Sequence, residues 1–311
     1  GLAFLLGYFN NQLEEQFDTI ERQQITSQVE RLGTSLSLAI NKKLFLVTSL
    51  RAFIEAKATH EELHNEHELE RFSANLYKNI NGIRNIALGR DGVIHFVYPY
   101  EENKSVLGYE PAKDTRPHVV AEVQRAIESR VVIISLPNDL IQGGLGIIAR
   151  QAIFVDENYW GLANIVVDVQ PLLEEAGIIP LPEGLNLALK DQSGNVFFGD
   201  ESVFIGEPII FDIPLPEDSW VLAVTPANGW GTGYQSVLWF YRSLFMLIML
   251  ILPITVYLSI NRKERLKEKV AEKTRDLTET LLVLEENKEH FKKIIAQSPI
   301  SMVITDEKGD I

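Results

Sequence analysis

The stretch VLWFYRSLFMLIMLILPITVYLSI, residues 237–260, decides how this 311-residue chain is organised. Residues 244–258 are almost wholly apolar, and with their flanks they reach the ~20 residues that an α-helix needs to cross ~30 Å of hydrocarbon. Trp239 and Tyr241 stand at one edge, where aromatic residues gather at membrane interfaces. We therefore expect a transmembrane helix at residues 236–260, in preference to a buried helix of a soluble domain.

A basic cluster follows this span directly. Positive charges beside a span mark its cytoplasmic side. We therefore expect residues 10–235 to be extracytoplasmic and residues 261–311 to be cytoplasmic, with the chain held in the cell (inner) membrane. The cluster consists of Arg262, Lys263, Arg265, Lys267 and Lys269.

The overall composition excludes several classes of function. The formal charge of −14 argues against a nucleic-acid surface, because such a surface needs basic residues to replace the counterions of the phosphates. The chain contains no cysteine, which removes disulfides, thiolate nucleophiles and cysteine-based metal sites together. We expect no cofactor, no metal and no nucleic-acid partner.

Residues 10–57 predict one long helix, because they contain no proline and only one glycine, Gly33. Such a helix would span on the order of 70 Å, more than one small domain covers, so we interpret it as a stalk and as one contact of a homodimer. Residues 1–9, GLAFLLGYF, are too short to span a bilayer, and we expect them to be the end of a truncated first transmembrane helix. The apolar residues at helical spacing are Leu13, Phe17, Ile20, Val29, Leu32, Leu36, Ile40, Leu44, Val47 and Ile54.

Two groups of strands follow, bounded by Gly, Pro and Asp residues. In the first, RNIAL and VIHFVY flank the turn signal Asp91-Gly92, a helix follows at 117–129, and VVIISL, GIIARQAIF and GLANIVVDV complete the set. A short helix, PLLEEAG, leads to the second group, LNLALKD, VFFGD, PIIFDI and SWVLAVTP. This order predicts an α+β fold with two antiparallel-sheet modules, residues 58–170 and 171–235, the first with helices packed against one face.

A short coiled coil is predicted after the membrane span. Val270, Leu277, Leu284 and Phe291 recur at seven-residue spacing, which is the period of a coiled-coil seam. We expect a cytoplasmic coiled-coil linker over residues 261–290, which gives the homodimer a second contact.

Several short segments between residues 85 and 230, in one order, resemble a CHASE domain, the extracellular sensor of bacterial receptors and of plant cytokinin receptors. They are NIALGRDGVIHFVYP, ENKSVLG, RAIESRVVIISLPNDLIQGGLGIIARQAIF, YWG, VFFGDESVF and LPEDSWVLA. The resemblance implies a membrane-distal PAS-like module that holds a small-molecule ligand, a smaller membrane-proximal PAS-like module, and an output enzyme, commonly a histidine kinase or a diguanylate cyclase. Residues 291–311 resemble the start of a cytoplasmic PAS domain.

The resemblance transfers ligand residues to this chain position by position. Where the plant receptors have an aspartate that bonds adenine, this chain has Val119 beside His118; a leucine with backbone contacts corresponds to Ile141, and a threonine that reaches the ligand hydroxyl corresponds to Arg150. These replacements argue against a cytokinin. An arginine on a pocket wall favours a carboxylate or phosphate ligand, and the alternative for Arg150 is a salt bridge on an exposed strand face. The candidate ligand-binding residues are Arg150, Ile141, Gln142, Tyr98 and His118.

Two of these candidates also have simpler interpretations. Gln142 begins the glycine-rich stretch QGGLG, which lacks the following helix and the Lys-Ser/Thr of a phosphate loop, so we interpret it as a turn close to the pocket. Tyr98 supplies an aromatic ring near the end of the second strand, where packing alone explains it.

One motif suggests a different function. Residues 60–64, His60-Glu61-Glu62-Leu63-His64, spell the HExxH of zinc metalloproteases. The surrounding run THEELHNEHELE is heavily charged and lies in a connector, so we do not expect catalysis there. The leading hypothesis is the sensor part of a receptor histidine kinase, with a diguanylate cyclase or phosphodiesterase as the alternative output. A membrane-anchored metalloprotease that uses His60, Glu61 and His64, and a structural stalk without a ligand, are the alternatives of another class.

Overall fold

The computed structural model describes residues 2–58 and 66–297, and these divide into two compact units, the first ending at Gln235 and the second beginning at Ser236. The fold is α+β, as the alternation of helical and strand patterns predicts: a long helix and two antiparallel sheets, then a long apolar helix. The helices are α1 (Leu2–Ala58), α2 (Glu66–Lys78), α3 (Tyr100–Asn103), α4 (Pro117–Ser129), α5 (Val169–Glu175) and α6 (Gln235–Gln297), with 3-10 turns η1 (Lys104–Val106), η2 (Pro111–Lys113) and η3 (Glu201–Phe204). The strands are β1 (Ile83–Arg90), β2 (Val93–Tyr98), β3 (Ile133–Ile134), β4 (Asn138–Asp139), β5 (Leu145–Val155), β6 (Asn158–Asp168), β7 (Leu185–Asp191), β8 (Val196–Phe198), β9 (Ile209–Pro214) and β10 (Ser219–Pro226).

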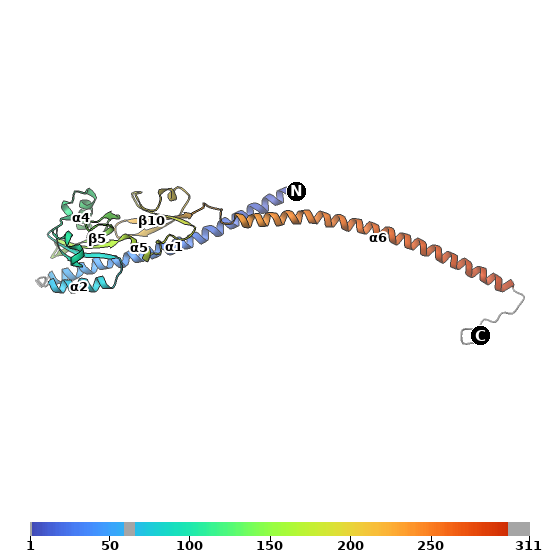
Figure 1. The fold of residues 1–311 in the computed structure, drawn as a ribbon, viewed down its shortest axis with the longest axis horizontal. Coiled ribbons are helices and arrows are strands. Elements are labelled where there is room, and N and C mark those ends of the chain that lie inside the picture. The colour runs from blue at the N-terminus through green and yellow to red at the C-terminus, as the bar shows by residue number, and fades with distance from the viewer. Residues whose placement is uncertain (1, 59–65, 298–311) are drawn as a thin grey trace, which may run out of the picture. The chain divides into compact units, whose positions relative to one another are not determined.

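The first sheet has the strand order β2-β1-β6-β5-β3, with β4 paired to β5. Its central strands are nearly continuous apolar runs, as expected of strands covered on both faces. One face packs on α1 and α2 through residues such as Ile86 and Ile165. Part of the other face packs on α4, where Val123 contacts the cluster that contains Leu162. Helices therefore cover both faces of this sheet, and not one face as the sequence order suggested (Figure 1).

The second sheet is smaller, with the strand order β8-β7-β10-β9. Alternation along its strands separates two sets of side chains. Leu187 and Leu222 join the core along α1, whereas Ala188 and Ala223 face the opposite way and form a small cluster with Val203 of η3.

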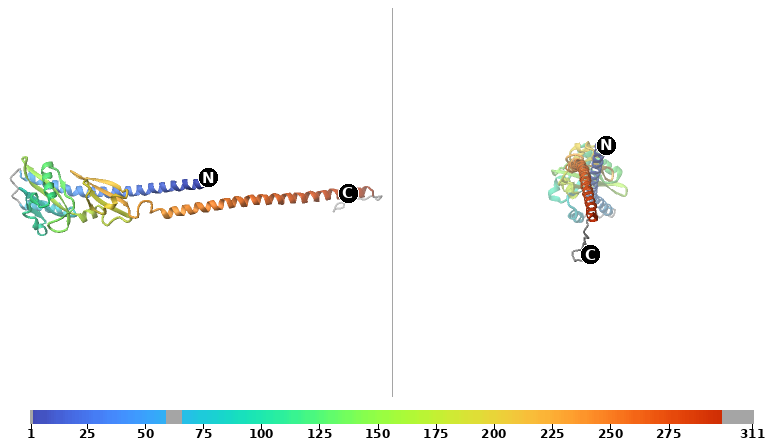
Figure 2. Two further views of the ribbon diagram at one scale, coloured as in Figure 1. Left: turned by 90° about the horizontal axis from the view of Figure 1, so that it is seen from above. Right: turned by 90° about the vertical axis from the view of Figure 1, so that its right-hand side faces the viewer.

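Helix α1 is shared by both sheets (Figure 2). A single contiguous hydrophobic core runs along it. One side of the helix is buried from Ile25 to Ile54. Most of the predicted apolar positions, from Val29 onwards, are therefore covered by the chain's own sheets and not left as a free seam. Gly33 marks the closest approach, since a Cβ there would lie 2.1 Å from the Phe211 ring of β9.

Helix α6 runs without a break through Pro253. An 18-residue window in it has a mean hydropathy of 2.4 and no buried residues, and among the described residues α6 is the one helix long and apolar enough to cross a membrane. Further along the same helix, the residues at seven-residue spacing from Val270 to Phe291 are all exposed.

Some predictions differ from the structure or fall outside it. The strand expected at 131–136 is reduced to β3, because the Ser135 hydroxyl accepts from the Ile148 main-chain N–H in place of a main-chain oxygen. Helix α1 is continuous from Leu2 to Ala58, with no break between the segments predicted at 1–9 and 10–57. The HExxH residues 60–64, and residues 298–311 of the expected PAS start, lie outside the described residues.

Candidate functional site

A pocket lies on the face of the first sheet that is turned away from α1. It contains about 540 Å³ of empty space, part of it open to solvent. Its roof is formed by Val106, Tyr109, Pro111, Arg116 and the residues from Asp139 to Gln142. Its floor consists of two cross-strand rows on β5, β6 and β1, Arg150–Asn164–Ala87 and Ile148–Val166–Asn85.

Three polar side chains stand in this otherwise apolar floor. Asn85, Arg150 and Asn164 are at most 5% exposed, although each is a polar residue in a strand of mainly apolar residues. Their strand neighbours, such as Ile86 and Ile165, belong to the core against α1, so strand alternation turns the three polar residues toward the pocket. Buried polar groups cost free energy unless they are hydrogen-bonded, which makes such positions candidates for ligand contacts.

Arg150 is the buried charge of the pocket. Its Nη2 lies 3.2 Å from Oε2 of Glu122 on α4, and both side chains are buried. The distance fits an ion pair, but Glu122 Oε2 completes no hydrogen bond, and Nε and Nη1 of Arg150 have no partner. Burial lowers the pKa of Arg150 and raises the pKa of Glu122, against the attraction between them. The predicted alternative of a salt bridge is thus partly correct, but this one is buried and leaves two donors unused.

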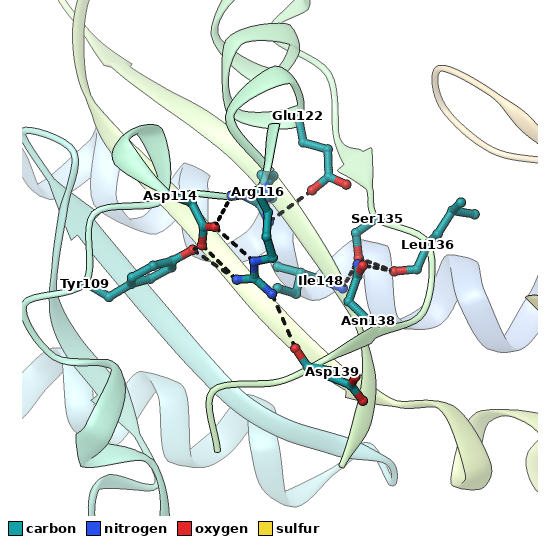
Figure 3. Close-up of polar contacts among 10 residues, drawn as sticks. Tyr109, Asp114, Arg116, Glu122, Ser135, Leu136, Asn138, Asp139 and Ile148 are labelled. Carbon is teal, nitrogen blue, oxygen red and sulfur yellow. Dashed lines mark hydrogen bonds and ion pairs between the residues drawn. The ribbon is translucent and has the colours of Figure 1, made fainter. Parts of the chain in front are cut away.

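Arg116, in the roof of the pocket, differs from Arg150 because all three of its nitrogens have hydrogen-bond partners (Figure 3). Its Nε and Nη2 donate to the two Asp114 oxygens at 2.9 and 2.7 Å, and Nη1 donates to the Asp139 main-chain oxygen at 3.4 Å. The Tyr109 hydroxyl donates to the same carboxylate. Hydrogen bonds from Arg116 hold the pKa of Asp114 well below its usual range, while burial and the bond to Asp114 raise the pKa of Tyr109 to about 12. The charge of Arg116 is therefore already compensated.

The loop that carries Ile141 and Gln142 is anchored to the sheet by Arg84. The Nε of Arg84 donates to Asp168 at 2.7 Å, and its Nη1 donates to the Gly143 main-chain oxygen. The turn needs glycine at 143 and 144, where φ is +85° and +77°. The glycine-rich stretch is a turn beside the pocket, as predicted.

The structure brings three of the five candidate residues together. Arg150, Ile141 and Gln142 all line the pocket. His118 is exposed on α4 and Tyr98 lies on the opposite face of the sheet, with its ring 5.6 Å from that of Tyr77 on α2. Neither Tyr98 nor His118 lines this pocket.

Sequence reasoning missed Asn85, Asn164, Arg116 and Tyr109. The two asparagines had a usable signal, since each is an amide in the middle of a mainly apolar strand. Arg116 and Tyr109 gave none, because they lie in irregular segments that only the tertiary structure brings over the sheet.

The histidine cluster gains no support from the part of the chain that the structure describes. Within residues 2–58 and 66–297, no group of three or more His, Cys, Asp or Glu side chains could hold a metal ion. His67, the described neighbour of the motif, is exposed and lies 4.0 Å from Glu70.

Solved structures with a similar fold are sensory domains of receptors. They include the periplasmic sensory domain of the Campylobacter jejuni chemoreceptor Tlp1 (13% identity, TM-score 0.52, 69% of this chain and 98% of that one). The ligand-binding domain of the Pseudomonas fluorescens chemoreceptor CtaA in complex with L-serine is similar (13%, 0.50, 68% and 96%), as is the sensory domain of the C. jejuni chemoreceptor Tlp3 (13%, 0.50, 71% and 98%). No protein-family profile matches the chain, and no curated protein matches its sequence.

At this level of identity the likeness is one of fold. The first unit of this chain has the fold of extracellular sensory ligand-binding domains.

Proposed function

We propose that this chain is the ligand-sensing part of a membrane receptor, and that the pocket over the first sheet binds a small molecule with a carboxylate or phosphate. The observation that carries this proposal is the state of Arg150. Its guanidinium is buried in the pocket wall, and two of its nitrogens have no hydrogen-bond partner. Both nitrogens are covered in this structure, so an anionic oxygen reaches them when the side chains over them move aside, and it then satisfies the donors with charge-assisted hydrogen bonds.

The energetics favour a ligand at this point. A buried donor without a partner costs about 1–3 kcal/mol, and more when it is charged, so a ligand that fills Nε and Nη1 recovers free energy on binding. Arg116 offers no equivalent gain, because Asp114 already occupies its fork. The chemoreceptor domain in complex with L-serine shows that this fold accommodates a carboxylate-bearing molecule in another protein.

The receptor proposal extends to the rest of the chain. The resemblance to CHASE domains and to a PAS start supports a sensor that regulates a histidine kinase, with a diguanylate cyclase or phosphodiesterase as the alternative output. In this proposal, residues 58–170 form the membrane-distal module, 171–235 the membrane-proximal module and 236–260 the span of the inner membrane.

Dimerisation belongs to the same proposal. On α1, Leu38 and Phe45 are seven residues apart and 65% and 68% exposed, so they form an apolar stripe that the chain's own sheets leave uncovered. The coiled-coil residues of α6 offer a second stripe with the same period. Both stripes support a homodimer.

Thermal unfolding of the full chain in detergent tests the ligand proposal. Acetate, pentanoate and inorganic phosphate are compared with the neutral purine adenine. An anion at ~100 times its Kd stabilises a one-site protein by about 2.7 kcal/mol, so the expected result is a rise in melting temperature with one or more anions.

The variants are chosen so that folding is preserved. Removing Arg150 alone would leave Glu122 buried and unpaired, at a cost of about 3–5 kcal/mol, so Arg150→Gln is combined with Glu122→Gln. We expect this double variant to lose the response to anions. Arg125→Gln is the control, since Arg125 lies on the same helix as Glu122 but is half exposed and pairs with Glu217 outside the pocket. Stabilisation by adenine alone, or an anion response that survives the double variant, would overturn the proposal.

A further inference from the structure

Asn85 presents a second unused polar group in the same floor, of the opposite kind. It is 1% exposed, and its Oδ1 has no hydrogen-bond partner. Its Nδ2 donates to Asn103 Oδ1 at 3.0 Å. The floor therefore contains an unused acceptor on β1 as well as the unused donors of Arg150 on β5.

The orientation of the Asn85 amide is fixed by its neighbours. Asn103 directs its Nδ2 at the Pro99 main-chain oxygen, 3.0 Å away, and a carbonyl can only accept. Asn103 Oδ1 must then be the end that faces Asn85 and Gln142, and it accepts from both. An exchange of the oxygen and nitrogen of Asn85 would bring two oxygens together, so its Oδ1 is the atom left without a partner, buried in the floor.

The strand register sets the separation of these two groups. Arg150 pairs with Asn164, Ala87 pairs with Asn164 on the other side, and Asn85 stands two residues from Ala87. Two strand spacings of about 4.8 Å and one two-residue step of about 6.7 Å place the Cα atoms of Arg150 and Asn85 about 12 Å apart. The apolar side chains of Ala87, Ile148 and Val166 form the floor between Arg150 and Asn85.

We propose that the pocket selects an elongated ligand with two different ends. A carboxylate binds Nε and Nη1 of Arg150, an ammonium or hydroxyl group donates to Asn85 Oδ1, and an apolar segment of several carbons lies on the floor between them. The inference rests on the proposed function and deepens it, because it assigns the ligand class and not only its charge. The two groups of an α-amino acid share one carbon and are too close together to reach both ends.

A homologous series measured by calorimetry on the full chain in detergent tests this inference. The probes are glycine, 3-aminopropanoate, 4-aminobutanoate and 5-aminopentanoate, with pentanoate as the match that lacks the donor. We expect affinity to rise along the series, with 5-aminopentanoate binding at least tenfold more tightly than either glycine or pentanoate. In Asn85→Leu, 5-aminopentanoate should fall to the affinity of pentanoate, while pentanoate itself is unchanged and reports an intact pocket.

The outcomes separate this inference from the proposed function. Glycine binding as tightly as the longer members, or no benefit from the amino group, overturns the two-ended ligand while carboxylate binding that depends on Arg150 stands. If Asp139→Asn loses the chain-length preference and Asn85→Leu keeps it, the ammonium group of the ligand binds Asp139 and not Asn85. That result also overturns the two-ended ligand as proposed. No carboxylate binding at all overturns both proposals. If Asn85→Leu fails to fold, the series on the unsubstituted chain decides by itself.

Discussion

Two arginines line one pocket, and their surroundings give them different roles. The Asp114 carboxylate accepts two hydrogen bonds from Arg116 and one from the Tyr109 hydroxyl. These three residues therefore form a closed hydrogen-bonded cluster. Arg150 meets one carboxylate oxygen, and two of its nitrogens, Nε and Nη1, have no hydrogen-bond partner. The closed cluster stabilises the roof, and the open arginine is available to a ligand.

The closed cluster predicts a dependence of stability on pH. The folded pKa of Asp114 lies below its ordinary value of 3.8, so its contribution is fully present above about pH 4 and is lost as the pH falls through the folded pKa. Hydrogen bonds to a charged group contribute about 1.5–3 kcal/mol, so Asp114→Asn should lower the free energy of unfolding by about that amount at pH 7. The difference between the variant and the unsubstituted chain should shrink as the pH falls below 4.

Melting temperatures between pH 2.5 and 8 provide the measurement, followed by the fluorescence of Trp160, Trp220 and Trp230 in the first unit. The control is Asp212→Asn, at an exposed position on β9. A difference between Asp114→Asn and the unsubstituted chain that stays constant across this range would contradict the assignment of a depressed pKa to Asp114.

At the scale of elements, most of the helices and the long strands were predictable because their patterns are local, whereas α2 was not located. Strand patterns and turn signals located β1, β2, β5, β6, β7 and β10, and apolar residues at helical spacing in a stretch without proline located α1. The roof of the pocket was not predictable. It is built from η1, η2, β4 and the loops around them, which are positioned by long-range contacts such as that of Arg84 with Gly143. The same limit explains why Arg150 could be chosen from the sequence while its partner Glu122 could not.

The contact between α1 and β9 gives a prediction at this scale. Glycine inside a helix usually costs about 1 kcal/mol relative to alanine, so Gly33→Ala would stabilise a free helix. Here the new Cβ would lie 2.1 Å from the Phe211 ring, and such overpacking costs about 1–3 kcal/mol. We expect Gly33→Ala to lower the melting temperature of the first unit.

A double-mutant cycle checks the cause. In a Phe211→Ala background, Gly33→Ala should become neutral or stabilising, because the ring that it meets is gone. Gly7→Ala is the matched control, since Gly7 lies in the same helix and its Cβ would meet nothing within 4 Å. A loss of stability from Gly33→Ala that is unchanged without the Phe211 ring would disprove this explanation.

At the scale of the molecule, the pocket is linked to both structural modules of the first unit. Helix α4 carries Glu122 beside Arg150, and one turn further on it carries Arg125, whose Nε lies 3.3 Å from Glu217 in the turn between β9 and β10. A ligand that draws Arg150 away from Glu122 therefore acts on a helix that also contacts the second sheet. Both sheets also pack on α1. A movement of α4 that pulls on the second sheet is therefore either resisted by the contacts with α1 or passed on to α1.

The membrane topology is the prediction on which the receptor proposal depends most. The apolar window of α6 ends beside five basic residues, and loops rich in Lys and Arg stay on the cytoplasmic side. Residues before Ser236 should then be extracytoplasmic and residues after Asn261 cytoplasmic. Reporter fusions at Gly194 and Glu279 test both sides, because Gly194 lies in an open turn and Glu279 is exposed on α6. A reporter that is active only outside the cytoplasm should work at Gly194 and fail at Glu279. Replacing the five basic residues by glutamine should weaken this asymmetry, whereas activity of a cytoplasm-only reporter at Gly194 would place the pocket inside the cell and remove the basis for an extracellular sensor.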